Sequence, residues 1–289
     1  MSGCNLCPRN CGADRRKGTG YCGEGQKIML ARAALHFYEE PCISGSRGSG
    51  AVFFCGCNMH CVFCQNNTIS GGGSAGKEVS KARLFEIFEE LISAGAHNIN
   101  LVTPTHYTDV LADILDKPLS VPVVYNCGGY EKPESLRLLE GKIKIFMPDF
   151  KYYDNSLAEK YSHAPHYRET AAKAIEEMYR QTGPFILNNE GILQSGVLIR
   201  HLVLPGQVQN TISVIDYINK TFGDDILFSL MFQYVPVAGV PPELSRRVSR
   251  YEYDKITDYL FDHGPKSGYV QDLSSSSEKY IPAFDGTGL

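Results

Sequence analysis

Three cysteines stand close together at a spacing that suits metal chemistry: Cys57, Cys61 and Cys64 follow the pattern C-x3-C-x2-C. A four-iron cluster usually takes four cysteine thiolates. The next cysteine along the chain is Cys127, so a cluster on this motif would leave one iron without a nearby protein ligand. Such an iron could bind and activate a small molecule. The alternatives are core thiols or a zinc site, although zinc sites normally supply four ligands in spaced pairs.

A second group of cysteines lies near the N-terminus, at Cys4, Cys7, Cys11 and Cys22. Four thiols can complete a closed site, which leaves zinc and a second iron–sulfur cluster as equal alternatives. Free core cysteines are a third alternative, but Gly, Asn, Arg and Lys surround this group instead of an apolar pattern. The sequence predicts a second metal site here without naming the metal.

The composition restricts the setting of these cysteines. The first ten residues are polar and lack the apolar core of a signal peptide, so we expect a reducing, cytoplasmic location in which ten cysteines indicate metal or redox sites. No apolar run approaches the length of a membrane span, which argues against a membrane partner. The net charge of -4, with scattered Lys and Arg, argues against a nucleic-acid partner.

The strands and helices that would hold the cysteine motif can be predicted from an alternation of short apolar runs with amphipathic segments. Between about residues 51 and 261 this alternation predicts an α/β fold in which βα units repeat around a parallel sheet. The predicted strands are 51–55, 98–102, 122–126, 143–147, 198–204 and 226–232. The clearest helices are expected from Ser80 to Gly95, from Pro133 to Gly141 and over Tyr167–Thr182. Ligands of such sheets bind at the carboxyl ends of the strands, and the cysteine motif directly follows the first strand.

This alternation divides the chain into three predicted parts. Residues 1–46 form a Cys-rich N-terminal segment, residues 47–265 the βα core, and residues 266–289 a C-terminal tail that we expect to pack on the core. Gly- and Ser-rich stretches predict a linker over 44–50 and loops over 70–76 and 274–277.

The cysteine motif, with Phe63 before its last cysteine, resembles the radical S-adenosylmethionine (SAM) signature. The longer run from Phe53 to Asn66 is similar to pyruvate formate-lyase activating enzymes and their activase-like homologues. This resemblance implies a partial (β/α)6 TIM-type barrel, with a 4Fe-4S cluster on Cys57, Cys61 and Cys64 and SAM on the open iron. In that family, reductive cleavage of SAM gives methionine and a 5′-deoxyadenosyl radical that abstracts hydrogen.

Further resemblances fall at later strand ends, and the first two depart from the family. Thr103 and Thr105 stand where the family usually has Gly-Gly-Glu for the SAM amino group, and His106 replaces the acid. Their carbonyls and hydroxyls could still accept hydrogen bonds from an ammonium group, although a helix cap is an equal alternative. Asn126 ends the third strand, where activating enzymes carry an acid in an Asp-Thr-Asn-Gly stretch, and it is a further candidate for binding the cofactor.

The remaining strand ends supply charged and polar candidates for binding the cofactor. Asp149 and Lys151 lie in a run similar to the family's Met-x-Asp-x-Lys, and they share one face of an extended chain. Arg200 matches a family arginine whose guanidinium could hold the methionine carboxylate in a two-bond fork. Gln233 follows the sixth strand, where the family contacts adenosine. A simple ion pair or a satisfied strand-end residue is the alternative in each case.

Cys127 is the remaining cysteine near the predicted site, either as a thiol hydrogen-atom donor or as a packing residue. The resemblance favours an activase that abstracts hydrogen from a glycine of a partner glycyl radical enzyme, with a flavodoxin- or ferredoxin-type electron donor. A radical SAM enzyme that modifies a small molecule, a peptide or a protein side chain is the alternative. A non-catalytic iron–sulfur or zinc protein, used for electron transfer or scaffolding, is the third possibility.

Overall fold

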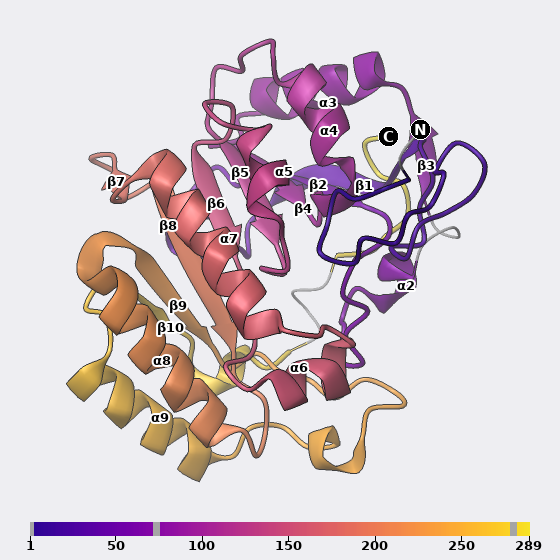
Figure 1. Ribbon diagram of the computed structural model, residues 1–289. Coiled ribbons are helices and arrows are strands. Elements are labelled where there is room, and N and C mark those ends of the chain that lie inside the picture. Colours follow the sequence, from indigo (N-terminus) through magenta and orange to yellow (C-terminus); the bar gives the residue numbers. More distant parts are fainter. Residues whose placement is uncertain (1–2, 72–75, 278–281) are drawn as a thin grey trace.

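The computed structural model describes residues 3–71, 76–277 and 282–289 (Figure 1). Its strands are β1 (Ile28–His36), β2 (Ser49–Phe54), β3 (Lys77–Val79), β4 (Ile99–Val102), β5 (Val123–Cys127), β6 (Ile145–Pro148), β7 (Ile186–Leu187), β8 (Leu193–Leu202), β9 (Leu227–Met231) and β10 (Gly268–Val270). Its α-helices are α1 (Pro41–Ser44), α2 (Asn67–Ser70), α3 (Lys81–Ser93), α4 (Thr108–Ile114), α5 (Pro133–Arg137), α6 (Asn155–Ser162), α7 (Tyr167–Thr182), α8 (Val208–Phe222) and α9 (Arg250–His263).

These strands form one open sheet in the order β10-β9-β8-β6-β5-β4-β2-β1-β3, with β7 paired to β8. The six predicted strands correspond to β2, β4, β5, β6, β8 and β9, which all run parallel to one another. The expected α/β fold with a partial barrel is therefore confirmed, and among the described residues no strand pair closes the sheet into a full barrel. Helices α3, α4, α5, α7, α8 and α9 lie along the outer side of the curved sheet (Figure 1).

Alternation along the parallel strands divides their side chains between two cores. In β5, Val123 and Tyr125 belong to the core under the helices, whereas Val124 belongs to a smaller core on the inner side. Successive side chains of a strand point to opposite faces, so Asn126 shares the inner face with Val124. In the same way, Arg200 on β8 follows the inner Leu198. The inner side thus changes from apolar to polar toward the carboxyl ends of the strands.

The helix predictions are confirmed with one correction. Ser80 caps α3, since its Oγ accepts a hydrogen bond from the backbone N–H of Arg83 at 3.1 Å. Helix α7 has the predicted bounds. Helix α5 ends at Arg137, short of the predicted end at Gly141. Beyond Arg137 the chain continues in turns whose hydrogen bonds span three residues instead of four, as in the bond from the Glu140 N–H to the Arg137 carbonyl.

The sheet also recruits segments that the sequence pattern did not indicate as strands. β1, from the Cys-rich segment, pairs antiparallel with β2 and with β3. The predicted linker over 44–50 is wrong in its last part, because Ser49 and Gly50 are buried at the start of β2. There the Ser49 hydroxyl donates to Asn98 Oδ1 at 2.6 Å and the Gly50 N–H donates to the Asn98 carbonyl at 2.9 Å.

Both ends of the chain lie near the same edge of the sheet (Figure 1). Gly286 donates its N–H to the Ala31 carbonyl, and Ala33 of β1 donates to the Thr287 carbonyl. In the predicted loop over 70–76, residues 72–75 lie outside the described part of the chain. The predicted loop over 274–277 begins within a 3-10 turn that spans Leu273–Ser275.

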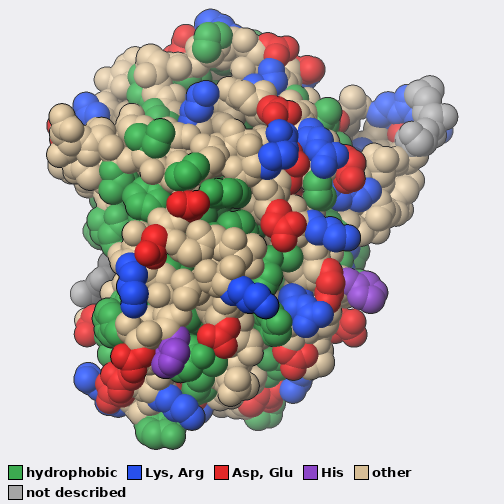
Figure 2. Space-filling model, turned by 60° about the vertical axis from the view of Figure 1, so that its left-hand side comes forward, with side chains coloured by type: hydrophobic (Ala, Val, Ile, Leu, Met, Phe, Trp, Pro, Cys, Tyr) green, Lys and Arg blue, Asp and Glu red, His purple; other side chains and the backbone are tan. Residues whose placement is uncertain are grey.

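Charges of both signs are mixed on the visible surface. On the face shown in Figure 2, Lys and Arg side chains are interspersed with Asp and Glu, and no large patch of one charge is visible. Among the residues that the structure describes, no helix has the length and apolar character needed to cross a bilayer.

Candidate functional site

The loop that follows β2 carries the three clustered cysteines. It begins at Gly56, whose φ of +82° favours glycine and whose neighbours leave no room for a side chain. A Cβ at this position would lie 2.6 Å from the Cys22 carbonyl oxygen. The loop then turns so that the Met59 N–H donates to Cys57 Sγ at 3.4 Å and the Ser162 hydroxyl donates to Cys61 Sγ at 3.0 Å. These contacts give two of the sulfurs donors that suit thiolates.

A cavity of about 260 Å³ opens beside this loop at the carboxyl ends of the parallel strands. This volume is near the lower end of the range for small-molecule sites. It is lined by most of the predicted site residues: Cys57, Cys61, Cys64, Thr103, Asn126, Cys127, Asp149, Lys151, Arg200 and Gln233. The tertiary structure therefore brings together residues that lie up to 176 positions apart in the chain, from Cys57 to Gln233.

The sulfurs of Cys57, Cys61 and Cys64 suit a cluster better than a single ion. Among the described residues, no three Cys, His, Asp or Glu side chains converge closely enough to hold one metal ion. In a 4Fe-4S cluster each cysteine binds a different iron, so the three sulfurs stand farther apart than the ligands of one zinc ion. Cys57, Cys61 and Cys64 all line the cavity, as ligands of the cluster that the motif predicts would.

A network of four charged side chains and one amide occupies the inner wall of the cavity. Arg200 is its centre: Nε donates to Asp149 Oδ1 at 2.9 Å, Nη1 to Glu39 Oε2 at 3.1 Å and Nη2 to Asn126 Oδ1 at 2.7 Å. Lys151 Nζ donates to the other carboxylate oxygen of Asp149. Every guanidinium nitrogen of Arg200 therefore already has a partner, and the predicted two-bond fork to a cofactor carboxylate would have to use the N–H groups that remain.

The charges in this network stabilise each other. Burial alone would raise the pKa of Asp149, but the adjacent Arg200 and Lys151 cations hold it below its usual value. Burial alone would lower the pKa of Lys151, but the Asp149 carboxylate raises it. Asp149 and Lys151 are therefore both ionised near neutral pH. Lys151 also acts electrostatically on Cys61, which places an ammonium group with spare protons next to the cysteine loop.

Glu39 is a member of the site that the sequence did not identify. It follows β1 in the N-terminal segment, and it lines the cavity together with His36 and Tyr38. Its partner Arg200 is 161 residues away in the chain. No local pattern around Glu39 signals this contact.

Thr103 is strained, whereas Thr105 lies outside the cavity. Thr103 has a φ of +60°, a conformation that a β-branched residue rarely adopts and that is concentrated at functional sites. Its N–H donates to the Asn126 carbonyl at 2.8 Å. Thr105 is buried, and its hydroxyl donates to Glu131 Oε1 at 2.7 Å, so the structure does not bring it to the cofactor side.

His106 and Cys127 also face inward to the protein. His106 Nε2 donates to the Cys55 carbonyl at 2.7 Å, and burial together with the nearby Arg15 lowers its pKa to about 3. The imidazole is therefore neutral, and it does not stand in for the family's acid. Cys127 borders the cavity, but its side chain belongs to the core under the helices, beside Glu131. This geometry favours the packing alternative for Cys127.

Gln233 lies on the opposite side of the cavity from the β2 end of the sheet, after β9. Its side-chain Oε1 accepts from Gln271 Nε2 at 3.3 Å, and its backbone carbonyl accepts from Gln65 Nε2 at 3.5 Å. The second contact ties the end of β9 to the residue that follows Cys64. Gln233 thus adds a polar residue to the cavity lining near the cluster loop.

The four N-terminal cysteines lie outside this cavity, in a separate group. All four are free thiols; Cys7 and Cys22 are buried and Cys11 is exposed. A Cβ at Gly20 would lie 3.4 Å from Cys11 Sγ and 3.5 Å from Cys22 Sγ, so these two sulfurs flank one backbone position.

Comparison with known proteins agrees with this geometry. The model of the radical SAM superfamily matches residues 51–215, which is more than half of the chain. The chain belongs to the radical SAM superfamily. Membership implies a 4Fe-4S cluster and SAM as the cofactors of a radical SAM enzyme, and the matched range includes the cysteine motif and every strand of the parallel core except β9 and β10.

One curated relative is the uncharacterized protein MJ0674 of Methanocaldococcus jannaschii, 29% identical over 267 residues, covering 88% of this chain and 73% of that protein. Among solved structures, Streptococcus suis SuiB bound to SAM has a TM-score of 0.51 at 14% identity over 77% of this chain and 51% of SuiB. Methylornithine synthase (PylB) has a TM-score of 0.52 at 15% identity over 80% of this chain and 68% of that one. This radical SAM chain thus spans about half the length of SuiB, and these likenesses show a shared fold.

Proposed function

We propose that this radical SAM protein abstracts a hydrogen atom from a backbone glycine of a partner enzyme, as an activase. The observation that supports the proposal is the cavity in which Cys57, Cys61 and Cys64 face the Asp149–Lys151 pair across the carboxyl ends of the strands. The sequence around both groups is similar to activating enzymes, and the cavity brings the two similar segments together.

The bound cluster and SAM would supply reductive cleavage of a sulfonium bond, which yields the radical that removes hydrogen. The chain's own residues hold and orient these groups. Cys57, Cys61 and Cys64 provide three thiolates for the cluster. Lys151 has two N–H groups beyond its bond to Asp149 and stands beside Cys61, so it is the best-placed donor for the methionine carboxylate.

Other groups in the cavity suit the rest of the cofactor. The strained backbone at Thr103 and the amide of Asn126 lie on neighbouring strands, where carbonyl oxygens can accept from the amino group. Gln233 suits the adenosine side. We assign Arg200 a positioning role, because its three bonds hold Asp149, Glu39 and Asn126 in one arrangement.

A second candidate function is modification of a small molecule or a peptide. Glu39 favours it, because this acid comes from the segment after β1 and gives the cavity wall a charged group that the ends of the parallel strands do not supply. The structure of SuiB bound to its precursor peptide SuiA shows that a protein of this fold can take a peptide. In either case we infer a flavodoxin- or ferredoxin-type electron donor and a reducing compartment such as the cytoplasm.

Anaerobic reconstitution with iron and sulfide, followed by reduction in the presence of SAM, tests the proposal. The wild-type protein is expected to release 5′-deoxyadenosine, and Cys57→Ala, Cys61→Ala and Cys64→Ala are expected to release none. Cys42→Ala is the matched control, since Cys42 is a buried core cysteine outside the cavity. Absence of cleavage by a fully loaded, reduced cluster would overturn the enzyme assignment.

The partner distinguishes the two candidates. An activase produces a glycyl radical signal on a glycyl radical enzyme by electron paramagnetic resonance, with about one 5′-deoxyadenosine per radical. Repeated turnover of SAM with a peptide or small molecule, and no stored radical on any partner, would favour the second candidate instead.

A further inference from the structure

The N-terminal residues 3–27 contain no helix or strand, yet they are folded against the barrel. The backbone closes on itself: Cys4 donates its N–H to the Ala13 carbonyl at 2.9 Å, and Gly12 donates to the Cys4 carbonyl at 3.0 Å. The segment has few apolar residues, and its Tyr21 is 40% exposed. A segment with so little apolar surface to bury needs another source of stability, and a bound metal centre is the usual one in small cysteine-rich units.

Backbone groups two residues further on lie beside three of the N-terminal sulfurs. The N–H groups of Arg9, Ala13 and Glu24 contribute hydrogen bonds to the sulfurs of Cys7, Cys11 and Cys22, and the Glu24 carbonyl lies 3.9 Å from Cys22 Sγ. Glycines with φ of +66° and +86° follow Cys11 and Cys22 directly, which permits these turns. The Met59 N–H makes the same contact with Cys57 in the cluster loop of the barrel. Both cysteine groups therefore share the N–H···S pattern that supports metal-bound thiolates.

The arrangement favours a cluster over a single ion. Four thiolates complete the ligand set of either a zinc ion or an iron–sulfur cluster. A zinc ion requires its sulfurs to converge on one point, and within the described residues no three potential ligands converge in that way. A Cβ at Gly20 would lie 3.4 Å from Cys11 Sγ and 3.5 Å from Cys22 Sγ, so both sulfurs lie beside one backbone position. A cluster fits thiolates that do not meet at one point, because each binds its own iron or shares an iron with one other.

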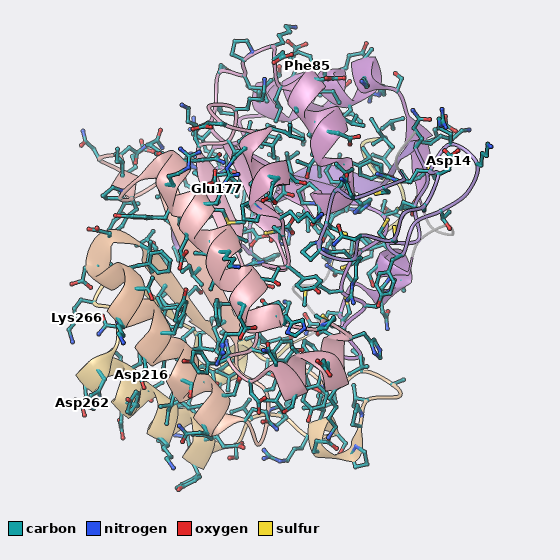
Figure 3. All side chains as sticks on the ribbon, in the orientation of Figure 1. Asp14, Phe85, Glu177, Asp216, Asp262 and Lys266 are labelled. Atoms are coloured by element: carbon teal, nitrogen blue, oxygen red, sulfur yellow. The ribbon has the colours of Figure 1, made fainter. Side chains whose placement is uncertain are left out.

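The segment contacts the cluster loop of the barrel directly. The Cys57 N–H donates to the Cys22 carbonyl at 3.1 Å, so one hydrogen bond joins a ligand of each group. Arg9 reinforces this contact: its Nε donates to the Asn58 carbonyl at 2.7 Å, and its guanidinium lies 4.2 Å from the Tyr21 ring centroid. At the other end, Cys11 is exposed to solvent. The loop that carries Asp14, just after it, lies at the periphery of the molecule (Figure 3).

We propose that Cys4, Cys7, Cys11 and Cys22 bind a second iron–sulfur cluster, which relays electrons to the cluster on Cys57, Cys61 and Cys64. A flavodoxin- or ferredoxin-type protein gives one electron to the second cluster near Cys11, and the second cluster is reoxidised when that electron passes to the first cluster on the Cys22 side. No bond or proton changes in this step. The relay role rests on the proposed function, whereas binding of the second cluster does not.

Iron and sulfide analysis of reconstituted protein tests the binding. The triple variant Cys57→Ala/Cys61→Ala/Cys64→Ala is expected to retain about two to four iron atoms with matching sulfide, and a reduced-cluster paramagnetic signal that SAM does not change. Cys11→Ser, a mild change at an exposed residue, is expected to alter this signal without altering the SAM-sensitive one. A triple variant that carries zinc or no metal overturns the proposal.

Reduction kinetics test the relay. In Cys11→Ser, reduction of the SAM-sensitive cluster by the protein donor is expected to lose most of its rate, whereas reduction by dithionite, a small reductant, is unchanged. Cys42→Ala serves as the control for loss of a cysteine elsewhere. Equal rates with the protein donor in Cys11→Ser and wild type overturn the relay. Because the iron analysis needs no SAM cleavage, failure of the proposed function and failure of this inference give different results.

Discussion

Glu131 provides the most direct test of the electrostatics around the site. Its carboxyl group is 1% exposed, accepts from Thr105 Oγ1 at 2.7 Å and from the Tyr125 hydroxyl at 3.2 Å, and lies beside Cys127. Burial raises its pKa to about 7, from 4.5, because the hydrogen bonds from these neighbours offset only part of the lost solvation. We expect Glu131 to keep its proton in the folded protein at mildly acidic pH.

The raised pKa determines the sign of the effect on stability. Between pH 4.5 and about 7, the folded protein holds a proton at Glu131 that the unfolded chain has lost, so the free energy of unfolding falls as pH rises through this window. The difference between 4.5 and about 7, at about 1.4 kcal/mol per pKa unit, corresponds to about 3.5 kcal/mol. Glu131→Gln cannot ionise, so its stability relative to wild type should increase by about this amount from pH 4.5 to pH 8.

Denaturant unfolding of reconstituted protein under anaerobic conditions, at several pH values, measures this difference. Comparison of variant and wild type at each pH cancels the pH dependence of cluster release, which both share. Glu177→Gln is the control: Glu177 lies on α7 (Figure 3), and its pKa is lowered by hydrogen bonds from Arg180, so its effect should be constant from pH 5 to 8. If the curves for Glu131→Gln and wild type are parallel over this range, the carboxyl is ionised when folded and the reasoning fails.

Three further predictions concern the cavity. Asp149→Asn leaves the buried Arg200 and Lys151 without their shared carboxylate. The free energy of unfolding, measured by denaturant titration, should therefore fall by about 3–5 kcal/mol. A loss below about 1 kcal/mol would mean that solvent replaces the carboxylate. Lys151→Ala should weaken SAM binding to the cluster-loaded protein by about tenfold or more in a titration. Thr105→Val should leave the affinity for SAM unchanged and lower the free energy of unfolding by about 1–3 kcal/mol. Equal effects of the two variants on the affinity would contradict the placement of Lys151 inside the cavity and Thr105 outside it. Cys127→Ala should not change the deuterium content of 5′-deoxyadenosine formed in deuterium oxide, because the thiol packs in the core; loss of deuterium would identify it as a hydrogen donor.

Local features of the sequence were sufficient for the framework of this protein. Cys57, Cys61 and Cys64 lie within eight residues, so their spacing survives in any fold and predicts a cluster with an open iron. The apolar runs predicted the six parallel strands because strands that are covered on both faces are apolar over most of their length. Ser80 predicted the start of α3 through a cap that involves only its next three residues.

Long-range contacts decided the rest. Glu39 meets Arg200 across 161 residues, and Thr105 turns from the cavity to Glu131, because the pairing of β1 with β2 and the packing under the helices set those directions. The charges of Asp149 and Lys151 likewise depend on neighbours from other strands. The sequence by itself determined which chemistry the cysteine loop can support and which strand ends present polar groups. Only the tertiary structure decided which of those groups reach the cavity, because side-chain direction and burial depend on the whole sheet.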